Sequence, residues 1–177
     1  MNRDQLEHVL RAASAIVDET DVLVIGSQAV LGSIPDEQLP PEATTSIEAD
    51  VAFLDDPDDE KADLVDGAIG ELSTFHATYG YYAQGVSVST ATLPAGWRDR
   101  LVTLATPNTA PARGLCLEPH DCVISKLVAF RPKDVDFAAA LLRERLVDPA
   151  VLAERIELLP SPTAVKDRLR AWVEQHR

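Results

Sequence analysis

The sequence predicts an α+β protein, because short apolar runs alternate with helical patterns up to residue 118 and helical patterns predominate beyond it. Apolar residues recur at helical spacing over 4–18, which predicts an amphipathic helix. The runs 22–25 and 47–54 have the length and composition of buried strands. With 177 residues, 46% of them hydrophobic, the chain can form one compact domain with a core and a C-terminal helical part.

The middle of the chain carries weaker signals. A short helix is expected at 28–31, and the proline-rich stretch 32–46 is expected to be a loop. Residues 61–72 look helical. Three further segments alternate or hold β-branched residues, and we expect strands there: 86–93, 101–106 and 114–117.

The segment 73–84 is rich in rings. It holds five of the thirteen Phe, Trp, Tyr and His residues: Phe75, His76, Tyr79, Tyr81 and Tyr82. One interpretation is a loop that packs onto the sheet. The other is a wall of a nucleotide pocket, where a ring stacks on a base.

Two acids stand two residues apart in the second predicted strand. Because side chains alternate along a strand, Glu48 and Asp50 should project from one face. Such carboxylates repel each other unless a cation lies between them. The first strand ends in a turn at Gly26 and Ser27, and the turn and the acids together could hold a nucleoside triphosphate and its magnesium.

A second group of polar residues lies in the predicted helices. Pro119 suits the start of one helix, on which Lys126 has only apolar neighbours three and four positions away. Its ammonium therefore needs a carboxylate or a phosphate, unless it reaches the surface along its own stem.

Pro132 separates this helix from the next, which should run from about Lys133 to Arg145. Asp134 faces the apolar side there, although an acid in a first turn is also favoured by the helix dipole alone. Arg131 and Lys133 lie beside Asp134 in the sequence. We therefore expect these cations to bind a triphosphate and the acid to orient a lysine or a substrate hydroxyl.

Charge is unevenly distributed. The net charge of −13 argues against a general nucleic-acid binder. Residues 1–97 hold 3 Lys and Arg against 18 Asp and Glu, whereas residues 98–177 hold 13 against 11. Either the acidic half keeps the protein in solution, or its acids hold metal while the basic half faces the phosphates of a nucleotide or RNA.

Cys116 and Cys122 form no CxxC motif, so we expect reduced, buried cysteines in a cytoplasmic protein. No apolar run is long enough to cross a bilayer, and the N-terminus has no signal-peptide pattern, so no membrane is expected among the partners.

These motifs together resemble a known superfamily. The strand ending in Gly26-Ser27, followed by the acid-x-acid strand, resembles nucleotidyltransferases with a polymerase-β-type core. Lys126-x4-Arg131-x-Lys133-Asp134 resembles the K-x4-R-x-K-D signature of AbiEii/MenT-like toxins and of the uncharacterised DUF6036 group. The stretch from Glu48 through Trp97 looks especially like that last group.

The resemblance implies a mixed sheet flanked by helices, with a nucleotidyltransferase-like core at 1–115 and a helical part at 116–177 packed on it. It implies phosphate contacts from Gly26 and Ser27, magnesium held by Glu48 and Asp50, and a second catalytic half containing Lys126 and Asp134. It also implies that Asp50, Lys126 and Asp134 are catalytic, while Lys126 and Arg131 are the cations expected to bind the nucleotide.

The expected activity is magnesium-dependent transfer of a nucleoside monophosphate from an NTP to a tRNA or protein acceptor. MenT-like members are toxins paired with an antitoxin, so a cognate antitoxin is an expected partner. An alternative is a non-catalytic nucleotide-binding or interaction module, either antitoxin-like or degenerate, because 86–93 offers only Ser and Thr where many members have a third carboxylate.

Overall fold

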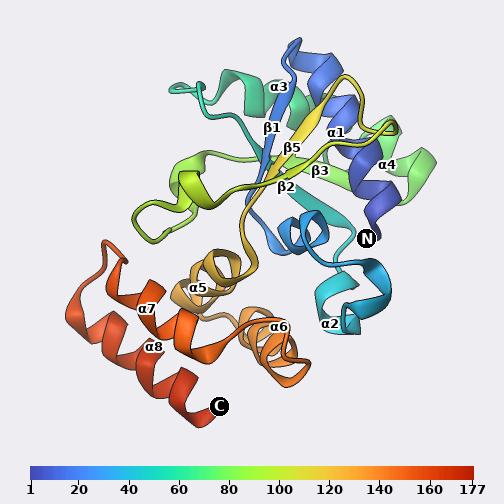
Figure 1. Cartoon of the computed structure of the whole chain (residues 1–177). Helices are drawn as coiled ribbons and strands as arrows, with labels where there is room; N and C mark the ends of the chain where they lie inside the picture. Colours follow the sequence, from blue (N-terminus) through green and yellow to red (C-terminus); the bar gives the residue numbers. More distant parts are fainter.

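A five-stranded mixed sheet forms the centre of the computed structural model, which describes all residues from 1 to 177 (Figure 1). The strands lie in the order β3-β2-β1-β5-β4. β1 pairs antiparallel with β2 and parallel with β5, while β2–β3 is parallel and β4–β5 antiparallel. Their bounds are β1 Asp21–Val24, β2 Glu48–Ala52, β3 Tyr82–Gly85, β4 Val102–Leu104 and β5 Arg113–Cys116. The α+β class with a mixed sheet is confirmed.

Helices of the first half surround this sheet (Figure 1). α1 packs against α3 and against β1, β3 and β5, and α3 lies along β3. Gly85 permits the close approach of α3, because a Cβ at this position would lie 1.8 Å from the carbonyl oxygen of Ala62. The helices before residue 101 are α1 Arg3–Val17, η1 Ser27–Gly32, η2 Asp36–Gln38, α2 Pro41–Thr44, α3 Glu60–Ile69, α4 Thr74–Tyr79, η3 Val88–Thr90 and η4 Trp97–Arg100, where η marks a 3-10 helix.

The remaining helices gather below the sheet in Figure 1. They are α5 Pro119–Ala129, α6 Pro132–Arg143, α7 Pro149–Glu157 and α8 Thr163–Gln175. Three of the four begin with a proline at the first helical position, where its missing N–H leaves no donor unpaired. α5 is central to this group, since it packs against α6, α7 and α8 and also against η1 beside the sheet.

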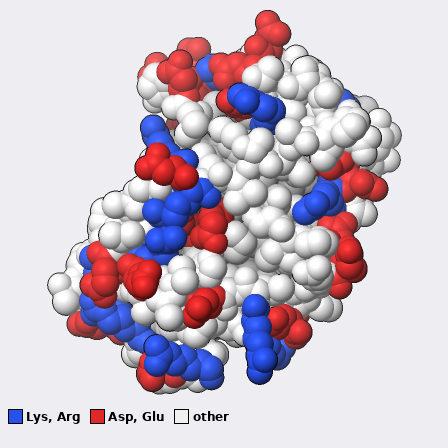
Figure 2. Space-filling model, in the orientation of Figure 1, with Lys and Arg blue, Asp and Glu red and all other residues white.

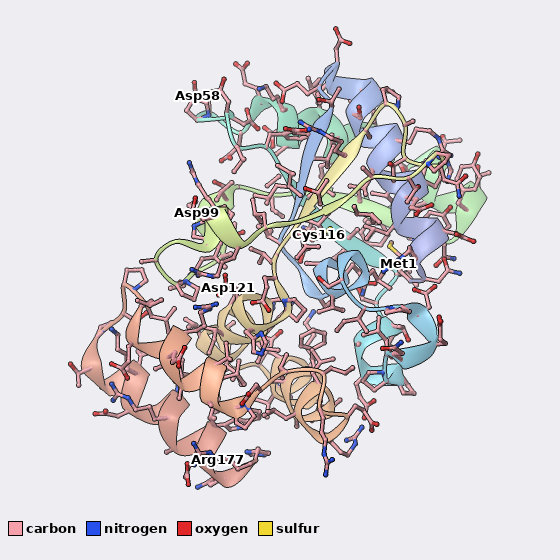
Figure 3. The ribbon with its side chains drawn as sticks, viewed as in Figure 1. Met1, Asp58, Asp99, Cys116, Asp121 and Arg177 are labelled. Carbon is pink, nitrogen blue, oxygen red and sulfur yellow. The ribbon has the colours of Figure 1, made fainter.

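A buried carboxylate connects the two parts (Figure 3). Asp121 of α5 is 0% exposed. It accepts hydrogen bonds from Arg100 Nε at 2.8 Å and Nη2 at 3.2 Å, and Arg155 Nε of α7 lies 3.2 Å from its Oδ1. Burial raises the pKa of Asp121 while Arg100 opposes that shift, so the two arginines supply the charge that burial of a carboxylate requires. The division at residues 115 and 116 stays a prediction.

Three local expectations were wrong. Residues 73–84 are not a loop but contain α4 and the edge strand β3, and 86–93 is not a strand but holds the 3-10 turn η3. Ser87 caps that turn by accepting a hydrogen bond from the Ser89 amide, and the chain leaves the sheet after Gly85. The stretch 32–46 contains the short helices η2 and α2 as well as loop.

Both cysteines are free and buried, as expected. Burial raises the pKa of each thiol to about 12, which leaves them in the unreactive protonated form. In this structure no helix combines the length and the apolar character that a membrane crossing requires.

Candidate active site

The two acids of β2 lie side by side at the centre of the site. Glu48 and Asp50 are partly exposed and line the same two cavities, as the alternation of the strand predicts. Gly26 lies between the end of β1 and the start of η1, close to Asp50. A Cβ at Gly26 would lie 2.0 Å from Asp50 Oδ2, so only glycine leaves room for this carboxylate in its position.

The acid pair is electrostatically strained. Burial, together with the hydrogen bond and negative charge of neighbouring Glu48, raises the pKa of Asp50 to about 6, while Lys126 and Lys133 act in the opposite direction. A carboxyl group in this state retains a proton to unusually high pH. A bound cation would replace that proton, because it removes the repulsion between the two carboxylates.

Tyr82 holds Glu48 in place. Its hydroxyl donates a hydrogen bond to Glu48 Oε2 at 2.8 Å, and the ring of His76 lies 4.7 Å from the Tyr82 ring, centroid to centroid. The parallel register of β2 and β3 sets this contact, because Glu48 pairs with Tyr82. One oxygen of Glu48 is thereby fixed.

A second charged group comes from the junction of α5 and α6. Asp134 is 1% exposed and accepts hydrogen bonds from Arg131 Nε at 2.6 Å and from Arg131 Nη2 at 3.2 Å. Lys126 Nζ lies 3.7 Å from its Oδ1. The inward orientation expected for Lys126 and Asp134 is therefore present. Because its oxygens face two cations, Asp134 is placed to orient Lys126 and Arg131 rather than to accept a proton from a substrate.

The two groups converge on two neighbouring cavities. The first, which we call the Gln84 cavity, has a volume of about 210 Å³, and the second, the Ser27 cavity, about 230 Å³. Both are lined by Glu48, Asp50, Lys126 and Lys133. The Gln84 cavity adds Gly26, Gln84, Arg131 and several small or apolar side chains, whereas the Ser27 cavity adds Ser27, Thr45, Ser46, Asp134 and Phe137 among others.

Ser27 is oriented from behind by a buried amide. Gln28 is 0% exposed, and its Nε2 donates to Ser27 Oγ at 3.3 Å and to the carbonyl oxygen of Ala43 at 3.3 Å. A hydroxyl that accepts from Gln28 keeps its own proton free to donate to a ligand in the Ser27 cavity.

Most of the ring-rich segment lies elsewhere. Phe75, Tyr79 and Tyr81 pack around His8 of α1, with centroid distances to His8 of 5.0, 4.6 and 6.0 Å. None of them lines either cavity, so the nucleotide-wall interpretation is wrong for these three. They pack against helix α1 instead, in a segment that is not a loop. Burial lowers the pKa of His8, and Arg11 lowers it further.

A third cavity, of about 730 Å³, is lined by none of these acids. It is bounded by the end of α6, the start of α7 and the C-terminus. Two of its arginines are already paired, Arg143 with Glu42 and Glu144, and Arg177 with Glu174. We therefore place the chemistry at the smaller cavities, where acids and lysines meet.

The sequence pattern missed Gln84 and the role of Tyr82, because it placed the neighbouring strand at 86–93. Tyr81-Tyr82-Ala83 could have revealed β3, since aromatic residues favour strands and Gly80, at φ 76°, marks the end of the preceding helix. The sequence pattern placed Lys133 only as a neighbour of Asp134. It lines both cavities and makes no ion pair.

The residues present suit a magnesium ion. Carboxylate oxygens are its preferred protein ligands, and Glu48 and Asp50 offer them in a partly buried position where a cation relieves their repulsion. The chain contains no group of three His, Cys, Asp or Glu side chains that could hold a metal ion. Any ion here relies on these two acids, on neutral oxygens beside them and on oxygens from a substrate.

A comparison with family models identifies the family of this chain. Residues 4–166 match the model described as nucleotidyltransferase of unknown function (DUF6036). The chain belongs to this family of nucleotidyltransferases. No curated protein and no solved structure matches it.

Proposed function

We propose that this protein transfers a nucleoside monophosphate from an NTP to a hydroxyl of an RNA or protein acceptor, with magnesium. The observation that carries the proposal is the convergence of Glu48 and Asp50 with Lys126 and Lys133 on the same two cavities. Acids that can hold a divalent cation and lysines that can contact phosphates are the two charge types that phosphoryl transfer needs.

The two cavities suggest where each reactant binds. The Ser27 cavity offers hydroxyl groups and lysines to the triphosphate, with Ser27 donating to an outer phosphate oxygen. The Gln84 cavity, with small and apolar side chains around the acids, receives the acceptor. The α-phosphorus then lies between them, next to Glu48 and Asp50.

In the reaction the acceptor hydroxyl oxygen bonds to the α-phosphorus, and the bond to the β-phosphate oxygen breaks. The pyrophosphate leaves with the electron pair, and the hydroxyl proton passes to water. Lys126, held by Asp134, and Lys133 offset the charge that gathers on the phosphate oxygens. Magnesium, when bound, supplies further charge neutralisation at the triphosphate. Most of the rate enhancement then comes from positioning and electrostatics.

A transfer assay tests this proposal. The protein is incubated with each α-labelled NTP, magnesium and total tRNA, and label is measured on RNA and on protein. Wild type should transfer label, whereas Asp50→Asn and Lys126→Ala should lose at least about 100-fold, the range that charge-stabilising groups contribute. Asp136→Asn is the matched control, because this acid is exposed and makes no ion pair.

The toxin role implied by the resemblance has its own test. Induced expression of wild type should arrest growth of the host, and Asp50→Asn should not. Growth arrest that persists in Asp50→Asn would separate any toxicity from this site.

One observation favours a different function. Gln84 is neutral at the place beside Asp50 where a third carboxylate would complete the acid group. A non-catalytic nucleotide-binding module would bind an NTP with magnesium and transfer no label to RNA or protein. Binding without transfer under all four nucleotides would therefore favour the module over the enzyme.

A further inference from the structure

Gln84 occupies a defined place beside the acid pair. In the parallel register of β2 and β3, Asp50 pairs with Gln84 as Glu48 pairs with Tyr82. Residues paired in this way project from the same face of a sheet. Gln84 is exposed and lines the same cavity as both acids. It is therefore the third polar side chain around the position where a cation would lie.

The charges at this position suit one divalent cation. The two carboxylates carry at most two negative charges, and Gln84 adds a neutral amide oxygen. One oxygen of Glu48 is already engaged by Tyr82 at 2.8 Å. A pair of metal ions needs carboxylates on both sides, and no third acid or histidine joins this group.

Two lysines bring further positive charge to the same cavities. Lys126 is partly balanced by Asp134 at 3.7 Å, but Lys133 has no carboxylate partner. Both lysines line the same two cavities as Glu48 and Asp50, so their charge acts at the acid pair. A second divalent cation in the Gln84 cavity would meet repulsion that no additional acid offsets, because the other nearby acids, Asp134 and Glu42, line the Ser27 cavity and are paired with Arg131 and Arg143.

We propose that the site holds a single divalent cation, that Lys133 takes the electrostatic place of a second one, and that Gln84 fixes this number by offering no charge. This inference rests on the proposed function, because it concerns the same acids and the same triphosphate. It adds that the acceptor side has neither a second metal ion nor a third carboxylate. The hydroxyl attacks there without a carboxylate at position 84 to accept its proton.

Counting bound metal tests the inference without turnover. The full chain is mixed with a smaller amount of an α,β-methylene NTP, which cannot release pyrophosphate, and is titrated with Mn²⁺ while free Mn²⁺ is measured by electron paramagnetic resonance. Wild type should bind one Mn²⁺ per chain–nucleotide complex. Two Mn²⁺ per wild-type complex would overturn the inference while leaving the proposed function intact.

Gln84→Glu provides the matched variant, because it keeps the shape of the side chain and adds only a charge. It should bind a second Mn²⁺, whereas Gln84→Met should still bind one. A count of one in Gln84→Glu would overturn the assignment to Gln84. Circular dichroism confirms that each variant is folded.

Lys133→Met separates the role of the lysine from that of the metal. It should weaken binding of the analogue by about 10- to 100-fold, as expected for loss of a charge-assisted hydrogen bond, and leave the Mn²⁺ count at one. Unchanged affinity would overturn the role of Lys133. If wild type binds neither Mn²⁺ nor the analogue, the proposed function fails, and the inference fails with it.

Discussion

The acid pair Glu48 and Asp50 should lower the free energy of unfolding, and Asp50→Asn should raise the free energy of unfolding. Burial and Glu48 together raise the pKa of Asp50 from 3.8 to about 6. The folded chain therefore holds the proton at pH values where the unfolded chain has released it. The acid pair therefore lowers the free energy of unfolding least below about pH 4, where Asp50 is protonated in both states. The free energy of unfolding decreases as the pH rises from about 4 to about 6, and this contribution is constant at higher pH.

The size of the effect follows from this difference. The rise in the pKa of Asp50 from 3.8 to about 6 corresponds to about 3 kcal/mol. Asp50→Asn removes the charge and keeps the shape, so its free energy of unfolding should exceed that of wild type by about 1–3 kcal/mol at pH 8. The gain should shrink steadily as the pH falls from about 6 towards 4.

Urea unfolding between pH 4.5 and pH 8, without divalent cations, measures this difference. Asp136→Asn, an exposed acid on α6, controls for the loss of one negative charge from an acidic protein. Wild type should also gain stability when Mg²⁺ is added, and Asp50→Asn should gain much less. An Asn variant that is less stable than wild type at pH 8 would refute the electrostatic account of the pair.

Three further changes probe other parts of the structure. Asp121→Asn leaves two arginines without a buried carboxylate, so it should lower the free energy of unfolding by about 3–5 kcal/mol, measured by urea unfolding. Tyr82→Phe removes the hydrogen bond to Glu48 and should weaken Mn²⁺ binding by about 10-fold or more with little change in melting temperature, as calorimetry can show. Gly26→Ala forces the Asp50 carboxylate away by steric overlap, and should lower stability by about 1–3 kcal/mol while abolishing detectable Mn²⁺ binding.

The site was easier to predict than the edge of the sheet. Alternation in β2 fixes the common face of Glu48 and Asp50, and the apolar neighbours of Lys126 fix its inward direction, so local spacing was sufficient for both. Their meeting in space was implied by a resemblance of motifs, and the structure brings them to the same cavities.

The strand beside the acids could not be placed in the same way. The alternating residues of 86–93 resemble a strand, but alternation says nothing about whether a neighbouring strand is available for pairing. The true edge strand is only four residues long, and it begins within the segment 73–84, for which a loop was one interpretation. Gln84 was missed because its importance comes from its register with Asp50, which is a tertiary property.

The distribution of charge also acquires a structural meaning. In the view of Figure 2, most Lys and Arg side chains lie over the lower half, where α5 to α8 gather, while many acids lie at the upper end. Arg131, which lies between α5 and α6, lines the Gln84 cavity even though Asp134 engages part of its guanidinium. The basic residues of the second half that line the candidate site are Lys126, Arg131 and Lys133.

The ion-paired carboxylate between sheet and helices has a consequence for how the molecule comes apart. The two carboxylate oxygens of Asp121 contact Arg100 at the end of η4 and Arg155 of α7. Separating the sheet from the C-terminal helices would therefore expose three charges at once. We expect heating to melt both regions in one cooperative transition, and a fragment ending at residue 115 to be unable to fold alone.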